Sequence, residues 1–304
     1  MFTALSGKQR TATELARDLG LPGERLELLL YSLAAADLLV ADGDRFTAAP
    51  ETSRILDRNS PAFVGDVHKG FRLMWEAALK TSETLRSGSP RARIDFSAMN
   101  EEQLESFYRG FYAAAVAAGR DLANAHDLSG ARSLVDVGGG SGGFAVAMVE
   151  RWPELEVTVA DLPAVIPITE RFLAAAGTGE RVRAVATDVV KHPLRGSYDV
   201  AVLRALIQVL SPDEARRVLR NVAESLSPGG TIFILGRVLE DSRLQPLSSV
   251  LSNVVFLNIF PEGQAYTKSQ YRAWVEEAGF VDVTVEISSD GRGTVRARKD
   301  ATRG

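Results

Sequence analysis

The sequence predicts an α/β protein in which a mostly parallel, seven-stranded sheet follows a helical N-terminal part. Three observations predict this fold class. Residues 1 to about 130 have helical periodicity, short apolar runs alternate with amphipathic segments from Ser133 onward, and two β-rich runs come last. Such alternation implies right-handed crossovers and a sheet covered on both faces.

Composition limits the possible functions. The chain has 304 residues, 45% hydrophobic and 24% charged, which suffices for one large domain and a smaller one. Its net charge of -4 and pI near 5.6 provide no general attraction for nucleic acid or an anionic membrane. The chain has no cysteine, which excludes disulfides and thiolate chemistry, and its three widely spaced histidines, His68, His126 and His192, predict no metal site.

The chain also shows no secretion signal and no apolar stretch of about 18 residues or more. We therefore expect a soluble, cytoplasmic protein that does not bind membranes.

The first predicted elements resemble a winged helix. Thr13–Leu21 and Pro22–Leu30 form a helix-turn-helix pattern. The runs Leu38–Val40 and Arg45–Thr47 then flank Asp42–Asp44 as the strands of a wing would. We assign residues 1–90 to a winged-helix-like, otherwise all-α domain.

A DNA-binding role for this domain is disfavoured by its charges. The candidate recognition helix and the residues after it carry Glu24, Glu27 and Asp37 against Arg25, and the remaining surface is rich in leucine and alanine. A helix that enters a DNA groove needs basic and amide side chains. We expect this domain to mediate dimerisation, and a ligand-sensing DNA-binding regulator stays as an alternative.

The strands follow a helical segment, residues 91–130, that we expect to link the domains and to supply helices of the substrate pocket. Residues 131–300 then form the cofactor-binding domain. Its sheet ends with an antiparallel hairpin around Ser289–Gly291. The predicted strands are Ser133–Val137, Val157–Ala160, Val182–Thr187, Asp199–Leu203, Thr231–Leu235, Val281–Ile287 and Thr294–Arg298.

A glycine-rich turn follows the first strand, in the run Leu134–Gly143. Glycine allows left-handed backbone and close approach to a ligand, and the next helix offers free N–H groups at its start. Gly138, Gly140 and Gly143 match G-x-G-x-x-G, so an NAD-dependent oxidoreductase is an alternative. Asp136 favours S-adenosylmethionine instead, because a carboxylate there can accept hydrogen bonds from the ligand's ammonium group.

Two further aspartates end the next two strands. Asp161, followed by Leu162, lies about twenty residues after the glycines, where an acceptor can bind both ribose hydroxyls. Asp188 ends the third strand and can accept a hydrogen bond from the adenine amine. Ligands of open α/β sheets bind at this edge, so the sequence predicts one crevice for S-adenosylmethionine.

Four motifs together resemble the class I methyltransferases of the caffeate and hydroxyindole O-methyltransferase family: Val135–Gly143, Asp161–Pro163, Tyr198–Val200 and Leu226–Gly230. The likeness covers nearly the whole chain. It implies a Rossmann-like domain, a winged-helix-like domain that forms an intertwined homodimer, and methyl transfer to a small aromatic or polyketide-like hydroxylated molecule of secondary metabolism.

The resemblance also implies roles for individual residues. Gly138 would contact the methionine part of the cofactor, Asp161 the ribose, and Asp188 with Val189 the adenine. Arg204 matches a basic position that family members use at the cofactor.

The sequence departs from the family at the residues that handle the proton. Family O-methyltransferases have a histidine base four residues after the basic position, and this chain has Gln208. Two carboxylates that steady the histidine are replaced by Asn253 and Ala265. A methionine over the reaction centre, four residues after a phenylalanine, is replaced by Phe111 after Phe107.

An amide cannot take a proton, so several readings stay open. In the first, the acceptor is an acidic hydroxyl, an enolate or an activated aromatic carbon, and Gln208 orients it. In the second, the cofactor serves non-methylating chemistry. In the third, the protein is a non-catalytic binder. His68 is the one histidine that we consider as a relocated base. The candidate substrate residues are Tyr108, Phe111 and Tyr112 on one helix and Asn253, Phe256 and Asn258 on another.

Overall fold

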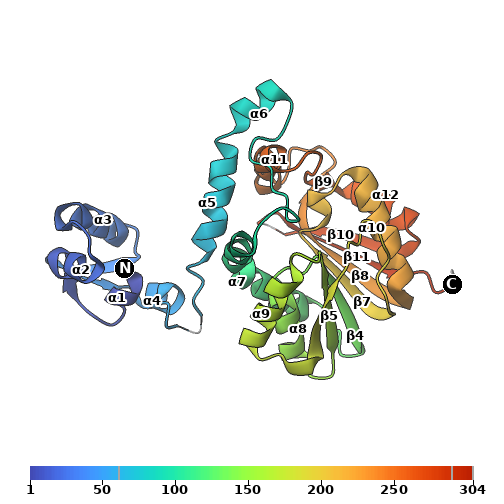
Figure 1. Cartoon of the computed structure of the whole chain (residues 1–304), viewed down its shortest axis with the longest axis horizontal. Coiled ribbons are helices and arrows are strands. Elements are labelled where there is room, and N and C mark those ends of the chain that lie inside the picture. The colour runs from blue at the N-terminus through green and yellow to red at the C-terminus, as the bar shows by residue number, and fades with distance from the viewer. Residues whose placement is uncertain (61, 289, 303–304) are drawn as a thin grey trace. The chain divides into compact units, whose positions relative to one another are not determined.

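The computed structural model describes residues 1–60, 62–288 and 290–302, and it divides into two compact units, Met1–His68 and Lys69–Gly304. The first unit is a small winged helix (Figure 1). Its antiparallel sheet has the order β1-β3-β2, so the predicted wing is confirmed. The elements are α1 (Phe2–Leu5), β1 (Arg10–Thr11), α2 (Ala12–Leu19), α3 (Gly23–Ala35), β2 (Leu39–Asp42), β3 (Arg45–Ala48) and α4 (Pro50–Leu56).

Local sequence signals set the limits of α2. Thr11 and Glu14 form a capping box at its start, and Gly20 ends it with a φ of +66°. Leu15, Leu30 and Phe46 are fully buried and join the helices to the wing. The first unit thus has its own apolar core.

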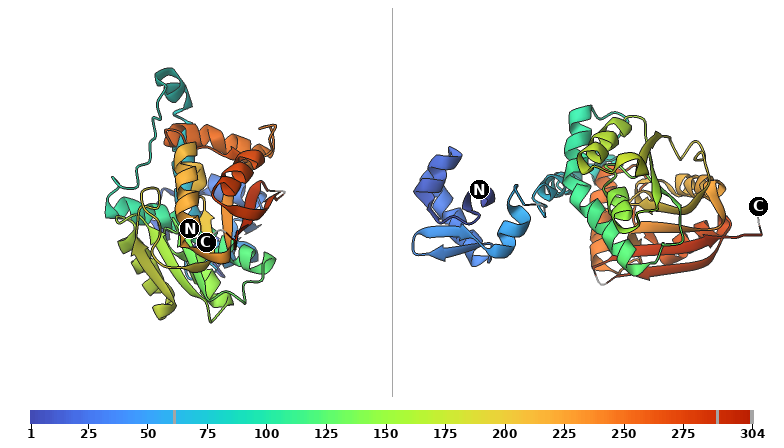
Figure 2. Two further views of the ribbon diagram at one scale, coloured as in Figure 1. Left: turned by 90° about the vertical axis from the view of Figure 1, so that its right-hand side faces the viewer. Right: turned by 90° about the horizontal axis from the view of Figure 1, so that it is seen from below.

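The second unit is built on a sheet of order β10-β11-β8-β7-β4-β5-β6, with the short β9 beside β8. Five of these strands are parallel neighbours, β8-β7-β4-β5-β6, and β10 and β11 are antiparallel at one edge (red in Figure 2). The strands are β4 (Ser133–Val137), β5 (Glu156–Asp161), β6 (Val182–Ala186), β7 (Tyr198–Arg204), β8 (Leu226–Leu239), β9 (Tyr266–Thr267), β10 (Phe280–Ile287) and β11 (Arg292–Lys299).

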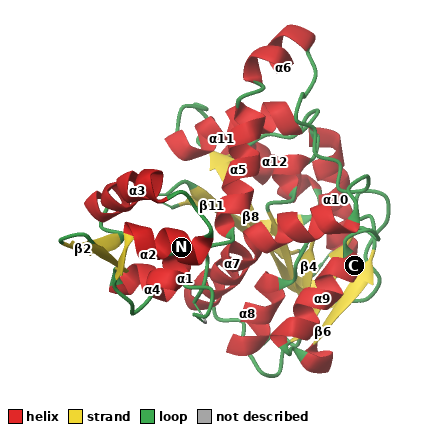
Figure 3. Ribbon diagram, turned by 60° about the vertical axis from the view of Figure 1, so that its left-hand side comes forward, coloured by secondary structure: helices red, strands yellow, loops and turns green. Residues whose placement is uncertain are grey.

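Helices cover both faces of this sheet (Figure 3). Side chains of α10 and α12 form one apolar core with the sheet, and those of α7, α8 and α9 form the other. The helices are α5 (Val67–Ala78), α6 (Thr81–Ser87), α7 (Glu101–Ala125), α8 (Gly143–Arg151), α9 (Ile166–Ala176), α10 (Pro212–Ser225), α11 (Leu247–Ile259) and α12 (Lys268–Glu277), with the 3-10 turns η1 (Gly179–Arg181) and η2 (Ile207–Val209).

The predicted Rossmann-like sheet is confirmed, and all seven predicted strands are present. β8 is longer than expected because it pairs with β7, β11 and β9 along its length. The hairpin is antiparallel as predicted, with Val285 opposite Val295. Its predicted turn includes Ser289, which lies outside the described residues.

The division at residue 68 differs from the expected domain limit at residue 90. Helix α6 packs against α11, and Asn258 Nδ2 donates a hydrogen bond to Thr81 Oγ1 at 3.0 Å. These contacts join α6 to the second unit. In the described part of the chain, no helix is both long and apolar enough to cross a membrane.

Candidate active site

A cavity of about 560 Å³ lies at the carboxyl ends of the parallel strands. Gly138, Asp161, Asp188 and Arg204 line it, and each stands at or just after the end of a different strand, β4, β5, β6 or β7. Helix α7 and the end of α11 supply further residues of the cavity wall. The predicted crevice is therefore present, because parallel strands bring residues distant in sequence to one edge.

The glycine turn after β4 is held between a strand and a helix. Gly138 and Gly140 have φ values of +68° and +57°, and Gly138 N donates to Ala160 O at 2.7 Å. A Cβ on Gly140 would lie 2.3 Å from Tyr108 Cε1. Gly140 thus permits the turn and the packing of α7, but it does not line the cavity as Gly138 does.

Asp161 supports this turn and faces the cavity. Its Oδ2 accepts a hydrogen bond from Gly140 N at 2.8 Å, and its Oδ1 accepts one from Leu162 N at 2.7 Å. Burial raises the pKa of Asp161 to about 6 despite these two bonds. Each carboxylate oxygen retains a second lone pair. The side chain can therefore accept two more hydrogen bonds from a diol in the cavity.

Asp136 lies behind the glycine turn, not on the cavity wall. Its side chain is fully buried, and neither carboxylate oxygen has a hydrogen-bond partner among the described residues. A Cβ on Gly139 would lie 2.5 Å from Asp136 Oδ2. Burial raises the pKa of Asp136 to about 7, although the charge of Arg204 opposes this shift. A nearby cationic ligand would stabilise its charged form.

Asp188 and Arg204 complete the polar wall. Asp188 Oδ1 accepts a hydrogen bond from Val190 N at 3.1 Å, and its Oδ2 pairs with Lys191 Nζ at 2.7 Å. Val189 lies beside it on the cavity wall. The guanidinium of Arg204 makes no hydrogen bond to a described residue, and burial lowers its pKa while Asp136 raises it. Arginine stays charged in proteins, so a cation faces the cavity here.

The cavity is acidic overall. Among the described residues, five carboxylates and two guanidinium groups line it: Asp95, Asp161, Asp188, Glu214 and Glu262, with Arg93 and Arg204. This balance favours a ligand that carries positive charge.

Aromatic side chains of α7 form another part of the cavity wall. Phe107, Tyr108 and Phe111 of α7 line the cavity, and the Phe107 and Phe111 rings are 4.9 Å apart. Burial raises the pKa of Tyr108 well above its ordinary value, with a further contribution from Asp161. Phe111 packs on α5, where a Cβ at Gly70 would lie 2.6 Å from its Cζ. This wall suits a planar, apolar molecule.

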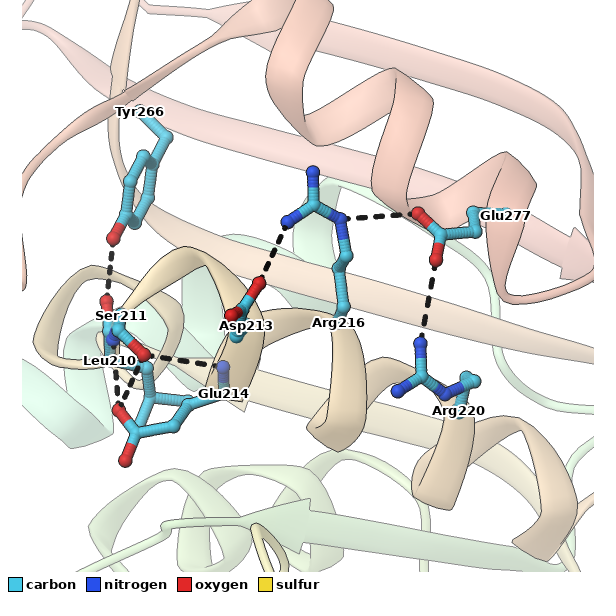
Figure 4. A network of polar contacts seen from close by, with 8 residues as sticks. All are labelled: Leu210, Ser211, Asp213, Glu214, Arg216, Arg220, Tyr266 and Glu277. Carbon is cyan, nitrogen blue, oxygen red and sulfur yellow. Dashed lines mark hydrogen bonds and ion pairs between the residues drawn. The ribbon is translucent and has the colours of Figure 1, made fainter.

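Gln208 lies in η2 on the cavity wall. Its Oε1 accepts a hydrogen bond from Arg237 N of β8 at 2.9 Å. The turn is fixed at its far end, because Tyr266 Oη donates to Leu210 O at 2.6 Å (Figure 4). Ser211 then caps α10, with Ser211 N donating to a Glu214 oxygen at 2.9 Å.

Farther along α10, Arg216 and Arg220 pair with Glu277 of α12 at 3.2 and 3.4 Å (Figure 4). Such exposed pairs contribute little to stability, about 0–1 kcal/mol each. The helix that follows Gln208 is therefore positioned mainly by its buried apolar face.

Three of the predicted substrate residues do not line the cavity. Tyr112 stacks on Phe172 with ring centroids 5.1 Å apart. Asn253 Oδ1 accepts a hydrogen bond from Ala265 N at 2.7 Å, and Asn258 Nδ2 donates to Thr81 and to Val254. Both amides thus make hydrogen bonds within the protein, although Asn258 Oδ1 has no partner among the described residues. Tyr108, Phe111 and Phe256 do line the cavity.

His68 is absent from the cavity wall. It belongs to the first unit, where its Nδ1 lies 2.6 Å from Gly65 O. Other wall residues were missed by the sequence analysis: Met74, Arg93, Asp95, Glu214 and Glu262. Glu214 belongs to a sequence pattern, the capping box with Ser211, but this pattern indicates the start of a helix and not a cavity.

Comparisons with known proteins identify the family of this chain. The family model of the O-methyltransferase domain matches residues 88–281. The chain is 29% identical to 3-hydroxy-5-methyl-1-naphthoate 3-O-methyltransferase of Streptomyces sahachiroi, over 98% of this chain and 88% of that protein. It is 25% identical to L-tyrosine C(3)-methyltransferase of Streptomyces lavendulae, over 92% of this chain and 80% of that protein.

A solved structure shares the fold. Human N-acetylserotonin methyltransferase, crystallised with S-adenosylmethionine, superposes with a TM-score of 0.83 at 21% identity, covering 98% of this chain and 90% of that one. Nothing in these comparisons favours an oxidoreductase or a DNA-binding regulator. The chain belongs to the O-methyltransferase family of S-adenosylmethionine-dependent methyltransferases.

Proposed function

We propose that this enzyme transfers the methyl group of S-adenosylmethionine to an oxygen of a small aromatic or polyketide-like hydroxylated molecule. The observation that carries the proposal is that one cavity combines a set of carboxylates, Asp161 and Asp188 at the strand ends among them, with an aromatic wall on α7. The first suits a sulfonium donor, and the second suits a planar acceptor. The naphthoate O-methyltransferase relative supports the same acceptor class.

The residues fit the cofactor. Asp161 has free lone pairs for the ribose diol, Asp188 with Val189 would hold the adenine, and Arg204 can bind the carboxylate of the methionine part. The two partnerless oxygens of Asp136 would gain from a cation close by. When bound, S-adenosylmethionine supplies an activated methyl group.

The protein would accelerate the transfer by alignment and by exclusion of water. Methyl transfer from a sulfonium is an in-line displacement, so holding the acceptor atom behind the methyl carbon contributes much of the rate. Phe107, Tyr108 and Phe111 would hold the ring of the acceptor, and Gln208 its oxygen. No proton passes through Gln208 in this scheme.

Methyl transfer to carbon is a second candidate. Gln208 stands where the family has the base that a phenol of ordinary pKa needs. An activated carbon, in contrast, needs no deprotonation before attack. The tyrosine C(3)-methyltransferase relative gives this reading a precedent.

We also propose that the protein is a homodimer through its N-terminal domain. Leu28 of α3 is 71% exposed, and Leu29, Tyr31 and Val40 are each more than 45% exposed in the same small unit. Exposed apolar side chains in this number favour a protein partner. Light scattering of the purified protein tests the proposal, and a monomer at micromolar concentration would contradict it.

The deciding experiment is mass spectrometry of phenols, naphthols, quinones and keto acids incubated with enzyme and methyl-labelled cofactor. A labelled O-methyl product is expected, and labelled C-methyl product would favour the second candidate. Calorimetry with S-adenosylmethionine and with NADH is the parallel test of the cofactor. Binding of NADH alone would contradict the proposal.

A further inference from the structure

The side chain of Gln208 can present only one kind of group to the cavity. Its Oε1 accepts a hydrogen bond from Arg237 N at 2.9 Å, and a backbone N–H is always a donor. The orientation of the amide is therefore fixed, with oxygen toward β8. A Cβ on Gly236 would lie 2.9 Å from this oxygen, so glycine in β8 leaves room for the arrangement.

The amide nitrogen remains for the ligand. Gln208 Nε2 makes no hydrogen bond to a described residue, and it is accessible and not buried. The residue itself lines the cavity. The nitrogen is thus open to the cavity. The turn that carries it is held by the hydrogen bond from Tyr266 to Leu210, which limits movement of the amide.

The described part of the cavity wall contains no histidine that could act as the family base. The ionisable groups on the described cavity wall are Arg93, Asp95, Tyr108, Asp161, Asp188, Arg204, Glu214 and Glu262. Four of the carboxylates already accept hydrogen bonds from backbone N–H groups, those of Ser97, Gly140, Val190 and Ser211. Among the described residues of the cavity wall, Glu262 is the one carboxylate whose side chain accepts no hydrogen bond from a protein N–H group.

We propose that Gln208 is a fixed hydrogen-bond donor that selects acceptors whose oxygen is already an anion, such as acidic phenols and enols. The inference rests on the proposed methyl transfer and deepens it. The proton leaves to solvent before the transfer. An oxygen lone pair of the anion then forms the O–C bond, the C–S bond breaks toward sulfur, and the negative oxygen and positive sulfonium both become neutral.

The selection follows from the chemistry of a donor. A hydrogen bond to the ionised form favours that form, and a charge-assisted bond favours it by roughly tenfold or more. A neutral phenol would have to turn its own O–H elsewhere. The family histidine, in contrast, accepts a proton and so accommodates neutral phenols.

Binding of chromogenic phenols tests the proposal without turnover. We would titrate 4-nitrophenol and 4-nitro-1-naphthol with the wild-type protein and S-adenosylhomocysteine across pH, and read the absorbance of the anions. The wild-type protein is expected to lower the apparent pKa of at least one bound phenol by about one unit, which corresponds to tenfold selection of the anion. Gln208→Glu places a carboxylate there and should abolish or reverse the shift.

Gln9→Glu is the matched control, because it makes the same change at an exposed position of the first unit. It should behave as the wild type. If the wild-type protein binds neither anion, or binds them with unchanged pKa, the proposal is overturned, whatever methyl transfer is found. If the shift is present but no acceptor is methylated, the proposed function fails and the donor role stands.

A kinetic arm tests the alternative base. With an accepted phenol, the wild-type kcat/KM should rise with pH through the pKa of the phenol and then level off. Glu262→Gln should keep the rise at the pKa of the phenol, because that rise reports the ionisation of the acceptor and not that of residue 262. A loss of several orders of magnitude in Glu262→Gln would identify Glu262 as a general base and overturn the donor role.

Discussion

Cofactor binding should depend on pH through two buried aspartates, since burial raises the pKa of Asp136 to about 7 and that of Asp161 to about 6. Below these values the free protein holds the neutral forms. A cationic ligand favours the charged forms, so affinity should be complete above pH 7 and fall as the pH drops through 7 and then 6.

The size of the effect follows from the two values. If the bound cofactor restores ordinary carboxyl pKa values, then at pH 5 deprotonation costs about two pKa units at Asp136 and about one at Asp161. Together these predict a Kd roughly 1,000-fold weaker at pH 5 than at pH 8. At pH 6.5 the free protein would carry about 0.8 of a proton on Asp136 and about 0.2 on Asp161, so binding should release about one proton.

Calorimetry in two buffers with different ionisation enthalpies measures this proton release directly. Asp136→Asn is the control, because it removes the larger contribution and should reduce the release at pH 6.5 to about 0.2 of a proton. A Kd that stays constant from pH 5 to pH 8, or the absence of proton release at pH 6.5, would refute the reasoning that these two groups are neutral in the free protein.

Three substitutions test other parts of the site. Asp161→Ala should weaken cofactor binding by more than about 100-fold in calorimetry, since it removes the diol acceptor and the support of the turn; a change below threefold would contradict this. Gly140→Ala should destabilise the protein by about 1–2 kcal/mol or more and lower Tm, because of its positive φ and its contact with Tyr108; an unchanged melting curve would count against it. Tyr266→Phe leaves Leu210 O without its donor and should reduce kcat/KM while cofactor affinity stays constant; weaker cofactor binding with normal turnover would argue for a different role.

Much of the fold can be read from local patterns. The strand limits, the glycine turn and the capping boxes depend on residues within a few positions of one another, as at Thr11 and Glu14. The meeting of Asp161 and Asp188 at one edge also follows, because the topology of a parallel sheet places all strand ends together. Local patterns and sheet topology therefore predicted the fold class, the family and most of the cavity residues at the strand ends.

The substrate side depended on the tertiary structure. Asn253 and Asn258 share the helix of Phe256, yet only Phe256 reaches the cavity, because the amides find partners twelve residues away at Ala265 and 177 residues away at Thr81. Likewise, Gln208 becomes a donor only because Arg237, 29 residues later, occupies its oxygen. Long-range hydrogen bonds decide which polar side chains face the cavity. Neither periodicity nor spacing in the sequence predicts which polar groups form these bonds.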